Sequence, residues 1–246
     1  MIRVNNLYKR FKKQYALQGI TVEFCRNQVV ALIGPNGSGK TTLIKCILGM
    51  VSPDEGDVFF NDTSVRKAVS YRADIGYMPQ IGRYPDNITV KQLIKMMISI
   101  RKANESDIDT ELMDAFRLNE IGYKTMQSLS GGTRQKVSAC LAFMFNPSVL
   151  ILDEPTAGLD PVSSEILKSK ILKEKAKGKS IIITSHILND IEDLATHVLY
   201  LQEGSVKIFN TLDDITMMTG EQRLNTSIAI LMKNNFYSQT AAPQNV

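Results

Sequence analysis

Apolar and polar residues near the N-terminus alternate in the manner of a β-strand. Residues 20–24 carry an apolar side chain at every second position, which predicts a strand with one buried face. Residues 29–33 are all apolar, as expected for a strand that is buried on both faces. A glycine-rich turn follows at 34–39, and the apolar spacing after this turn predicts a helix over 40–50.

Helical spacing interrupts this strand pattern in the middle of the chain. Short strands are predicted at 58–60 and 75–78. Thr89 and Gln92 then have the spacing of a capping box, in which each side chain accepts a hydrogen bond from the backbone N–H of the other residue at the first turn of a helix. Two helices are expected in this region, so residues 83–125 form a helical insert between two α/β halves.

Strands and helices alternate again after the insert. Strands are predicted at 149–152, 180–184, 198–201 and 206–209, and helices from Asp160-Pro161, over 187–195 and over 212–219. Such alternation argues for a mostly parallel sheet with both faces covered. The stretch 234–246 is uncharged and rich in Asn and Gln, and we expect it to fray.

Composition narrows the function classes without selecting one. The 246 residues carry a net charge of +4 with both signs mixed, which does not require a nucleic-acid partner. Three cysteines at unrelated spacings indicate neither a metal site nor a disulfide framework, and they suit a reducing cytosol. No leader is expected at the N-terminus, and the longest uncharged stretch, 137–152, is short for a bilayer span.

A run of lysines over 168–179 is predicted as a solvated helix face, with a lipid-headgroup contact as the alternative.

The segment 34–42 carries the strongest local signal for chemistry. It reads Gly34-Pro35-Asn36-Gly37-Ser38-Gly39-Lys40-Thr41-Thr42 and lies between a buried strand and a helix, as a phosphate-binding loop requires. Backbone N–H groups and the helix N-terminus would face phosphate oxygens, and Lys40 would reach the β- and γ-phosphates. The Thr41 hydroxyl would ligate magnesium. A glycine-rich turn without a ligand is the alternative.

Two carboxylates follow the apolar strand at 149–152. Ligands of parallel sheets bind at the carboxyl ends of the strands, where Asp153 and Glu154 stand. Asp153 would hold the magnesium ion, and Glu154 would act as the general base toward the attacking water. Solvated caps of a strand end are the alternative for both residues.

A second anion site is indicated at the start of another helix. Ser130 is a helix-capping residue type, and Gly131 and Gly132 leave backbone N–H groups accessible at that helix N-terminus. An ordinary capped core helix is the alternative.

Together these segments resemble the nucleotide-binding subunit of ATP-binding-cassette (ABC) transporters over residues 1–210. The resemblance adds Gln80 after a short strand, the segment Ala157-Gly158-Leu159-Asp160, and His186 after the strand at 180–184, all in the family's order. It implies an α/β P-loop NTPase fold of the RecA-like kind. A parallel-sheet core would carry an N-terminal antiparallel β subdomain and a helical subdomain insert, and 211–246 would be a C-terminal extension.

The resemblance also implies roles for single residues. Phe11 would stack on adenine, with core packing or a loop contact as the alternative. Gln80 would sense magnesium and the attacking water, and His186 would contact the γ-phosphate and help to position Glu154. Asp160 would cap the next helix and touch the opposite subunit.

The family works as a head-to-tail dimer around two ATP molecules with Mg²⁺. Ser130, Gly131 and Gly132 of one subunit would close on the γ-phosphate that Lys40 of the other subunit binds. The helical insert and the groove beside Gln80 would receive a membrane permease, which places the chain at the cytoplasmic face of the membrane. Thr133 departs from the family, which usually has Gln at this position, so this contact with the opposite nucleotide is in question.

Finer features of the sequence resemble exporter cassettes. The segments 129–136 and 158–164 are similar to those of exporter-type ATPases, including the ATPases of nitrous-oxide-reductase maturation that serve copper-site assembly. We therefore expect ATP-driven export. The most specific interpretation is a link to copper-enzyme maturation, with no metal site in this chain. The alternative is a soluble ABC-type ATPase that acts as a switch or assembly factor without a permease.

Overall fold

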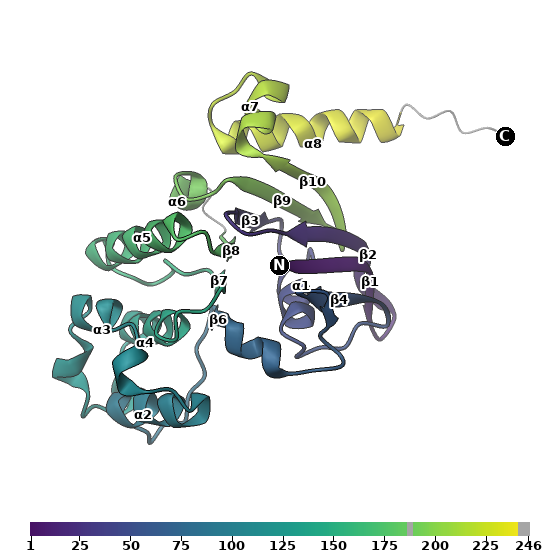
Figure 1. Cartoon of the computed structure of the whole chain (residues 1–246). Coiled ribbons are helices and arrows are strands. Elements are labelled where there is room, and N and C mark those ends of the chain that lie inside the picture. The colour runs from purple at the N-terminus through teal and green to yellow at the C-terminus, as the bar shows by residue number, and fades with distance from the viewer. Residues whose placement is uncertain (186–188, 241–246) are drawn as a thin grey trace.

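Two β-sheets organise the computed structural model, which describes residues 1–185 and 189–240 (Figure 1). The larger sheet contains, from edge to edge, β10 (Ser205–Thr211), β9 (His197–Gln202), β3 (Val29–Ile33), β8 (Ser180–Thr184), β7 (Val149–Asp153) and β6 (Ile75–Met78). The β10–β9 pair is antiparallel, and every other pair in this sheet is parallel. The predicted parallel core is confirmed.

The smaller sheet is antiparallel and lies at the N-terminal side. Its strands are, in order, β2 (Gln14–Phe24), β1 (Ile2–Phe11), β4 (Glu55–Phe60) and β5 (Thr63–Ser64). Asn61 and Asp62 connect the last two strands with positive φ angles, a backbone conformation that Asn and Asp tolerate better than most residues. This sheet is the expected antiparallel β subdomain.

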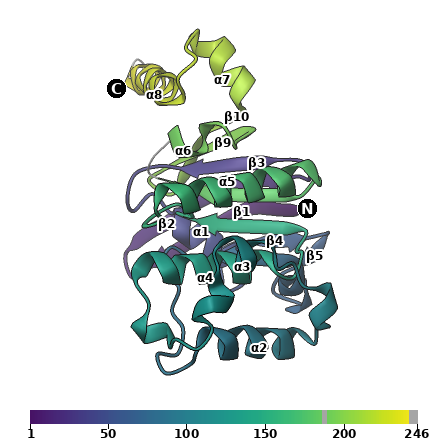
Figure 2. The ribbon, with the colours of Figure 1, turned by 90° about the vertical axis from the view of Figure 1, so that its left-hand side faces the viewer.

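Side chains of the central strand β3 enter two separate cores. Val30 and Leu32 pack with α1 (Lys40–Ile47) and the antiparallel sheet. Val29, Ala31 and Ile33 pack with α4 (Gly131–Phe143) and α5 (Pro161–Ala176) on the opposite face. Figure 2 shows α4 and α5 in front of the sheet and α2 (Val90–Arg101) of the helical insert below them. Burial on both faces explains why residues 29–33 are all apolar.

The helical insert begins with the predicted capping box. The Thr89 backbone N–H donates to Gln92 Oε1 at 2.9 Å, and the Gln92 N–H donates to Thr89 Oγ1 at 3.2 Å, at the start of α2 (Val90–Arg101). The second helix, α3 (Glu111–Ala115), is short and is preceded by a single 3₁₀ turn at Glu105–Asp107. Asp109 accepts a hydrogen bond from the Glu111 N–H, which delays the helix to that residue.

Two predicted helices end earlier than their apolar spacing suggested. Helix α1 ends at Ile47 because Gly49 adopts a left-handed φ of 64°, and Met50 is consequently exposed. Helix α6 spans Asn189–Glu192, whereas the prediction extended to residue 195. The chain leaves it toward the sheet, where the Thr196 N–H donates to the Val29 carbonyl at 2.8 Å.

The segment after β10 forms two helices at the edge of the molecule (Figure 1). Helix α7 (Leu212–Thr219) matches the prediction, and the Thr211 side chain caps it by accepting from the Asp214 N–H. Helix α8 (Leu224–Thr240) was not predicted, and its residues Leu224 and Ile228 are buried in the main core. Division of the chain at residue 210 stays a prediction, and residues 241–246 lie outside the described part. Within the described residues, no helix has the length and apolarity that a bilayer span demands.

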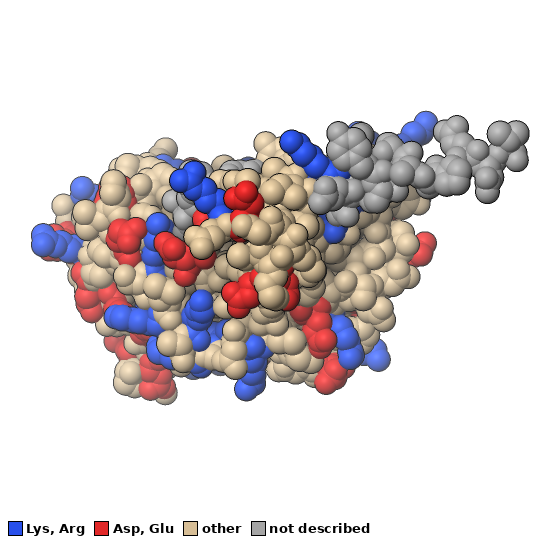
Figure 3. Space-filling model, turned by 90° about the horizontal axis from the view of Figure 1, so that it is seen from above, with Lys and Arg blue, Asp and Glu red and all other residues tan. Residues whose placement is uncertain are grey.

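The lysine run on α5 is only partly solvated, which corrects the sequence interpretation. Lys170 is buried and contacts Asp109, Glu111 and Glu174, because the insert packs acidic residues against this helix. Seen from above, positive and negative side chains are interspersed over the visible surface (Figure 3), in keeping with the mixed charge of the sequence.

Candidate active site

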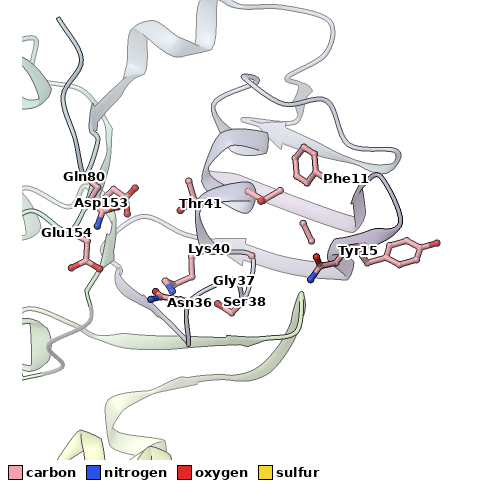
Figure 4. A pocket seen from close by; sticks show the side chains of 14 residues that line it. Phe11, Tyr15, Asn36, Gly37, Ser38, Lys40, Thr41, Gln80, Asp153 and Glu154 are labelled. Carbon is pink, nitrogen blue, oxygen red and sulfur yellow. The ribbon is translucent and has the colours of Figure 1, made fainter.

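Three segments meet at the carboxyl ends of neighbouring parallel strands. The loop after β3, the two carboxylates at the end of β7, and Thr184 at the end of β8 lie side by side, because β8 pairs with both other strands. The loop and the two carboxylates border a cavity of about 560 Å³ (Figure 4). Its lining residues are Phe11, Gln14, Tyr15, Ala16, Asn36, Gly37, Ser38, Gly39, Lys40, Thr41, Thr42, Gln80, Asp153 and Glu154.

Glycines allow the loop after β3 to pack closely on the rest of the protein. A Cβ atom at Gly34 would lie 2.1 Å from the Leu201 carbonyl oxygen, and one at Gly39 would lie 2.5 Å from the Ala16 carbonyl oxygen. Both residues also have positive φ angles, 146° and 107°, which a side chain would disfavour. The sequence pattern of this loop therefore reflects its backbone path.

Lys40 lies between the loop and the carboxylates. Its Nζ donates to the carbonyl oxygens of Gly34 and Pro35, at 2.7 and 3.1 Å. Burial lowers the pKa of Lys40, and the carboxylates of Glu154 and Asp153 oppose this effect. Gly34 and Pro35 do not line the cavity, so their contribution is to hold the Lys40 ammonium group.

Ser38 provides a buried hydroxyl group in the same loop. Its Oγ makes no hydrogen bond with the described part of the chain, although the residue is almost fully buried. A buried hydroxyl group without a partner is costly unless a ligand supplies one. Together with the Lys40 ammonium and the helix N-terminus of α1, it fits an anionic group such as a phosphate.

Thr184 holds the two carboxylate residues in place. Its Oγ1 donates to Asp153 Oδ1 at 2.5 Å and accepts from the Glu154 N–H at 3.0 Å. Glu154 has a left-handed backbone with φ of 54°, an uncommon conformation for a residue other than glycine, and such strain is frequent at functional sites. Sequence reasoning missed Thr184, although its place at the end of a predicted strand was a usable signal.

The oxygen donors of the cavity fit a magnesium ion. The Thr41 hydroxyl, the Gln80 amide and the buried Asp153 carboxylate line the same cavity. Magnesium prefers such hard oxygen ligands.

Phe11 lies at the end of β1, where it lines the cavity with 49% of its surface exposed. Core packing, the alternative considered for Phe11, is therefore wrong. The Lys9 ammonium lies 5.5 Å from the centre of its ring.

Ser130, Gly131, Gly132 and Asp160 do not line this cavity. Ser130 caps α4 and is exposed, its Oγ lying 3.2 Å from the Thr133 nitrogen and 2.8 Å from Thr133 Oγ1. A Cβ atom on Gly131 would meet no described atom within 4 Å, whereas one on Gly132 would lie 2.5 Å from the Gly158 carbonyl oxygen. The first turn of α4 is therefore open on one side only.

Asp160 caps α5 as predicted. Its carboxylate accepts from the Ser163 N–H at 2.9 Å and from Lys136 Nζ at 2.8 Å. Hydrogen bonds from Lys136 and Ser163 hold the pKa of Asp160 well below its usual range. His186 lies outside the described residues. His197 contacts Gln28 and Thr196.

The family model of ABC transporters matches residues 17–157, which is more than half of the chain. The chain belongs to the ABC transporter family. A P-loop NTPase fold and ATP hydrolysis follow from this membership, so both predictions are confirmed.

Curated relatives of this ABC cassette do not share one named cargo. The uncharacterised ABC transporter ATP-binding protein YhaQ of Bacillus subtilis is 30% identical over 91% of this chain and 76% of its own length. The lantibiotic transport ATP-binding protein SrtF of Streptococcus pyogenes is 31% identical over 84% of this chain and 89% of its own. The sulfate/thiosulfate import ATP-binding protein CysA 1 of Rhizobium meliloti is 32% identical over 87% of this chain and 64% of its own.

Solved structures of ABC cassettes match the fold of this one. An ATP-binding subunit of an ABC transporter superimposes with a TM-score of 0.88 at 30% identity, covering 94% of this chain and 99% of that one. A dimeric post-hydrolysis state of the cassette MJ0796, bound to ADP and Pi, has a TM-score of 0.75 at 22% identity, covering 86% and 98%.

Proposed function

We propose that this ABC cassette dimerises around two ATP molecules with Mg²⁺ and powers a separate membrane permease from the cytoplasmic face of the membrane. The observation that carries the proposal is that the predicted site residues fall into two groups at different places on the subunit. The phosphate loop, Gln80 and both carboxylates border one cavity, whereas the first turn of α4 lies elsewhere and is exposed. A complete site would then require a second subunit.

Each residue of the cavity has a separate task in this proposal. Loop residues 36–42 bind the phosphates through backbone N–H groups, and Lys40 exchanges its two carbonyl partners for phosphate oxygens. Thr41, Asp153 and Gln80 hold the metal ion, which supplies charge neutralisation at the phosphates when bound.

The proton chemistry belongs to the residues around Glu154 in this proposal. Glu154 accepts the proton of the attacking water as the general base.

Two further residues contact other parts of the nucleotide in this proposal. Phe11 offers its exposed ring to adenine, and His186 would contact the γ-phosphate.

The exposed turn of α4 suits the second ATP molecule of a dimer. Ser130 and the open side of Gly131 present a hydroxyl group and backbone N–H groups at a helix N-terminus, where an anion is favoured. Asp160 forms an ion pair with Lys136 of α4, which keeps it near the first turn of that helix. In a dimer that closes on this turn, Asp160 would touch the opposite subunit. The dimeric state described for MJ0796 supports this arrangement.

A groove beside Gln80 suits the permease. It has a volume of about 280 Å³ and is lined by Ile81, Gly82, Arg83, Tyr84, Asp86, Met126 and Arg134. Ile81, the residue after Gln80, is 72% exposed and offers apolar surface to a partner. A permease that contacts Ile81 would be one residue away from Gln80, which lines the nucleotide cavity.

Export is the direction that we propose, on the similarity of 129–136 and 158–164 to exporter cassettes. SrtF is named for lantibiotic transport, whereas CysA 1 is named for import, so overall identity does not decide the direction. None of the relatives named above is named for copper-enzyme maturation, and that link stays a prediction from the sequence.

Replacement of Glu154 by Gln tests the proposal. The variant should hydrolyse ATP about 10²-fold more slowly while it still binds ATP, because only the proton acceptor is lost. Tagged Glu154→Gln protein, captured from detergent-solubilised membranes with ATP and Mg²⁺, should bring a stoichiometric multi-span protein with it. Glu221→Gln, at an exposed position after α7, is the matched control.

Two results would contradict parts of the proposal. Normal hydrolysis by Glu154→Gln would remove the general-base role of Glu154. ATP-dependent dimers that capture only soluble proteins or nucleic acid would place the chain among the soluble switch ATPases instead.

A further inference from the structure

One face of α4 contacts the segment that runs from Glu154 to Asp160. Gln135 Nε2 donates to the Glu154 carbonyl oxygen at 3.3 Å, and Lys136 Nζ donates to Asp160 Oδ2 at 2.8 Å. Gly132, one turn earlier, lies so close to Gly158 that no Cβ atom would fit between them. Residues three or four apart share one face of a helix, so these contacts form a single row.

The Gln135 contact occurs at the strained residue of the active site. Glu154 has a φ of 54°, so its peptide groups need fixed partners to stay in this conformation. Its N–H donates to Thr184, and its carbonyl oxygen accepts from the Ala157 N–H at 3.1 Å and from Gln135. Both lone pairs of that carbonyl oxygen are thereby used. Gln135 itself is only 6% exposed, so its amide group has little access to water.

We propose that Gln135 is a positioning residue that couples the two ATP sites of the dimer. The inference rests on the proposed function, in which Ser130 contacts the ATP molecule of the partner subunit. Ser130 caps the helix that carries Gln135, and Gln135 holds the backbone of the general base that serves this subunit's own ATP. When the ATP molecule of the partner subunit binds against the first turn of α4, the hydrogen bond from Gln135 to the Glu154 carbonyl oxygen sets the position of Glu154.

The amide group of Gln135 is the chemical requirement of this coupling. A carboxylate of the same size has no proton to donate and would face the Glu154 carbonyl oxygen with its own oxygen atoms. A methionine side chain fills a similar volume without any donor. A residue that only filled space would tolerate methionine in hydrolysis assays, whereas a positioning residue would not.

Gln135→Glu, Gln135→Met and the exposed control Gln222→Glu should be compared with the wild type in two assays. One assay follows the rate of hydrolysis against ATP concentration, and the other follows ATP-dependent dimerisation by sedimentation. Both Gln135 variants should still dimerise with ATP, while kcat falls about 10- to 100-fold through misplacement of the base. The Hill coefficient for ATP should fall to about 1 in both, because occupancy of one site no longer reaches the other. Gln222→Glu should match the wild type.

The outcomes separate this inference from the proposed function. Wild-type protein that neither dimerises with ATP nor hydrolyses it cooperatively would contradict the proposed function itself. A cooperative wild type together with a Gln135→Met variant that keeps both kcat and the Hill coefficient within about twofold would overturn the role of Gln135 alone. If Gln135→Glu does not fold, Gln135→Met decides, because it introduces no buried charge.

Discussion

The ammonium group of Lys170 lies 3.2 Å from the carboxylate of Glu174, and each of these side chains exposes only 1% of its surface. Lys170 also contacts Asp109 and Glu111 of the helical insert, the latter at 2.8 Å. The buried ammonium group of Lys170 thus connects the insert to α5, the helix that Asp160 caps. The connection matters because Asp160 and α4 lie at the proposed dimer contact.

Replacing Lys170 by Met should destabilise the protein strongly. The variant leaves buried carboxylate groups without their shared cation, for which a loss of about 3 kcal/mol in the free energy of unfolding is typical. Lys173→Met is the matched control, since Lys173 pairs with Glu111 but is 60% exposed, and it should cost less than about 1 kcal/mol. Urea denaturation of both variants measures the difference. Equal losses would show that burial of Lys170 has no energetic consequence.

Acid should destabilise the protein partly through Glu174. Burial raises the pKa of Glu174, but hydrogen bonds from Lys177 and Lys179 outweigh burial and lower it from 4.5 to about 2. A lowered pKa means that the contribution of Glu174 to stability is complete above about pH 4.5 and is lost as the pH falls toward 2. Glu174→Gln should therefore reduce the loss of stability between these pH values. A variant whose acid unfolding curve keeps the wild-type slope would contradict this assignment.

Thr184 should be required as a hydroxyl group and not only as a β-branched side chain. Thr184→Val keeps the shape but removes the donor to Asp153 and the acceptor of the Glu154 N–H, both at a buried position. We expect a loss of about 1–3 kcal/mol in the free energy of unfolding and a lower kcat. Thr184→Ser restores the hydroxyl group and should recover most of the activity. Full activity of Thr184→Val would refute the role.

Local patterns predicted most of the fold correctly. The capping box at Thr89 and the cap at Asp160 depend on neighbouring residues only, and the apolar run at 29–33 reports burial on both faces directly. The phosphate loop was recognisable for the same reason, since its glycines serve a turn and a close approach that one short segment defines.

Contacts between distant segments were not predictable in this way. Lys170 reads as part of a charged surface run, and only the packing of Asp109 and Glu111 against α5 buries it. Gln135 likewise follows a helix start without any sign that it meets Glu154, 19 positions later. Helix α8 has no acidic residue in its first turn and no basic residue in its last turn, so its charges do not mark it in the sequence, and its burial against the core came only with the structure.

Thiol reactivity should distinguish the three cysteines. Cys46 and Cys140 are buried, and Cys25 is partly exposed. Burial raises the pKa of Cys46 to about 11 and raises that of Cys140 as well, so neither forms the reactive thiolate near neutral pH. Folded protein at about pH 8 should therefore react with Ellman's reagent at Cys25 only, and denatured protein at all three.

The variant Cys25→Ser gives a more stringent test of this prediction, because it removes the only cysteine that is not buried. Its folded form should then show no fast reaction, while its denatured form should show two thiol equivalents. Fast labelling of folded Cys25→Ser would mean that the packing around Cys46 or Cys140 opens readily. Cys46 is part of α1, the helix that begins at Lys40, so labelling there would place the opening beside the nucleotide cavity. Added ATP with Mg²⁺ should then slow the reaction, because a ligand that binds only the closed form opposes opening.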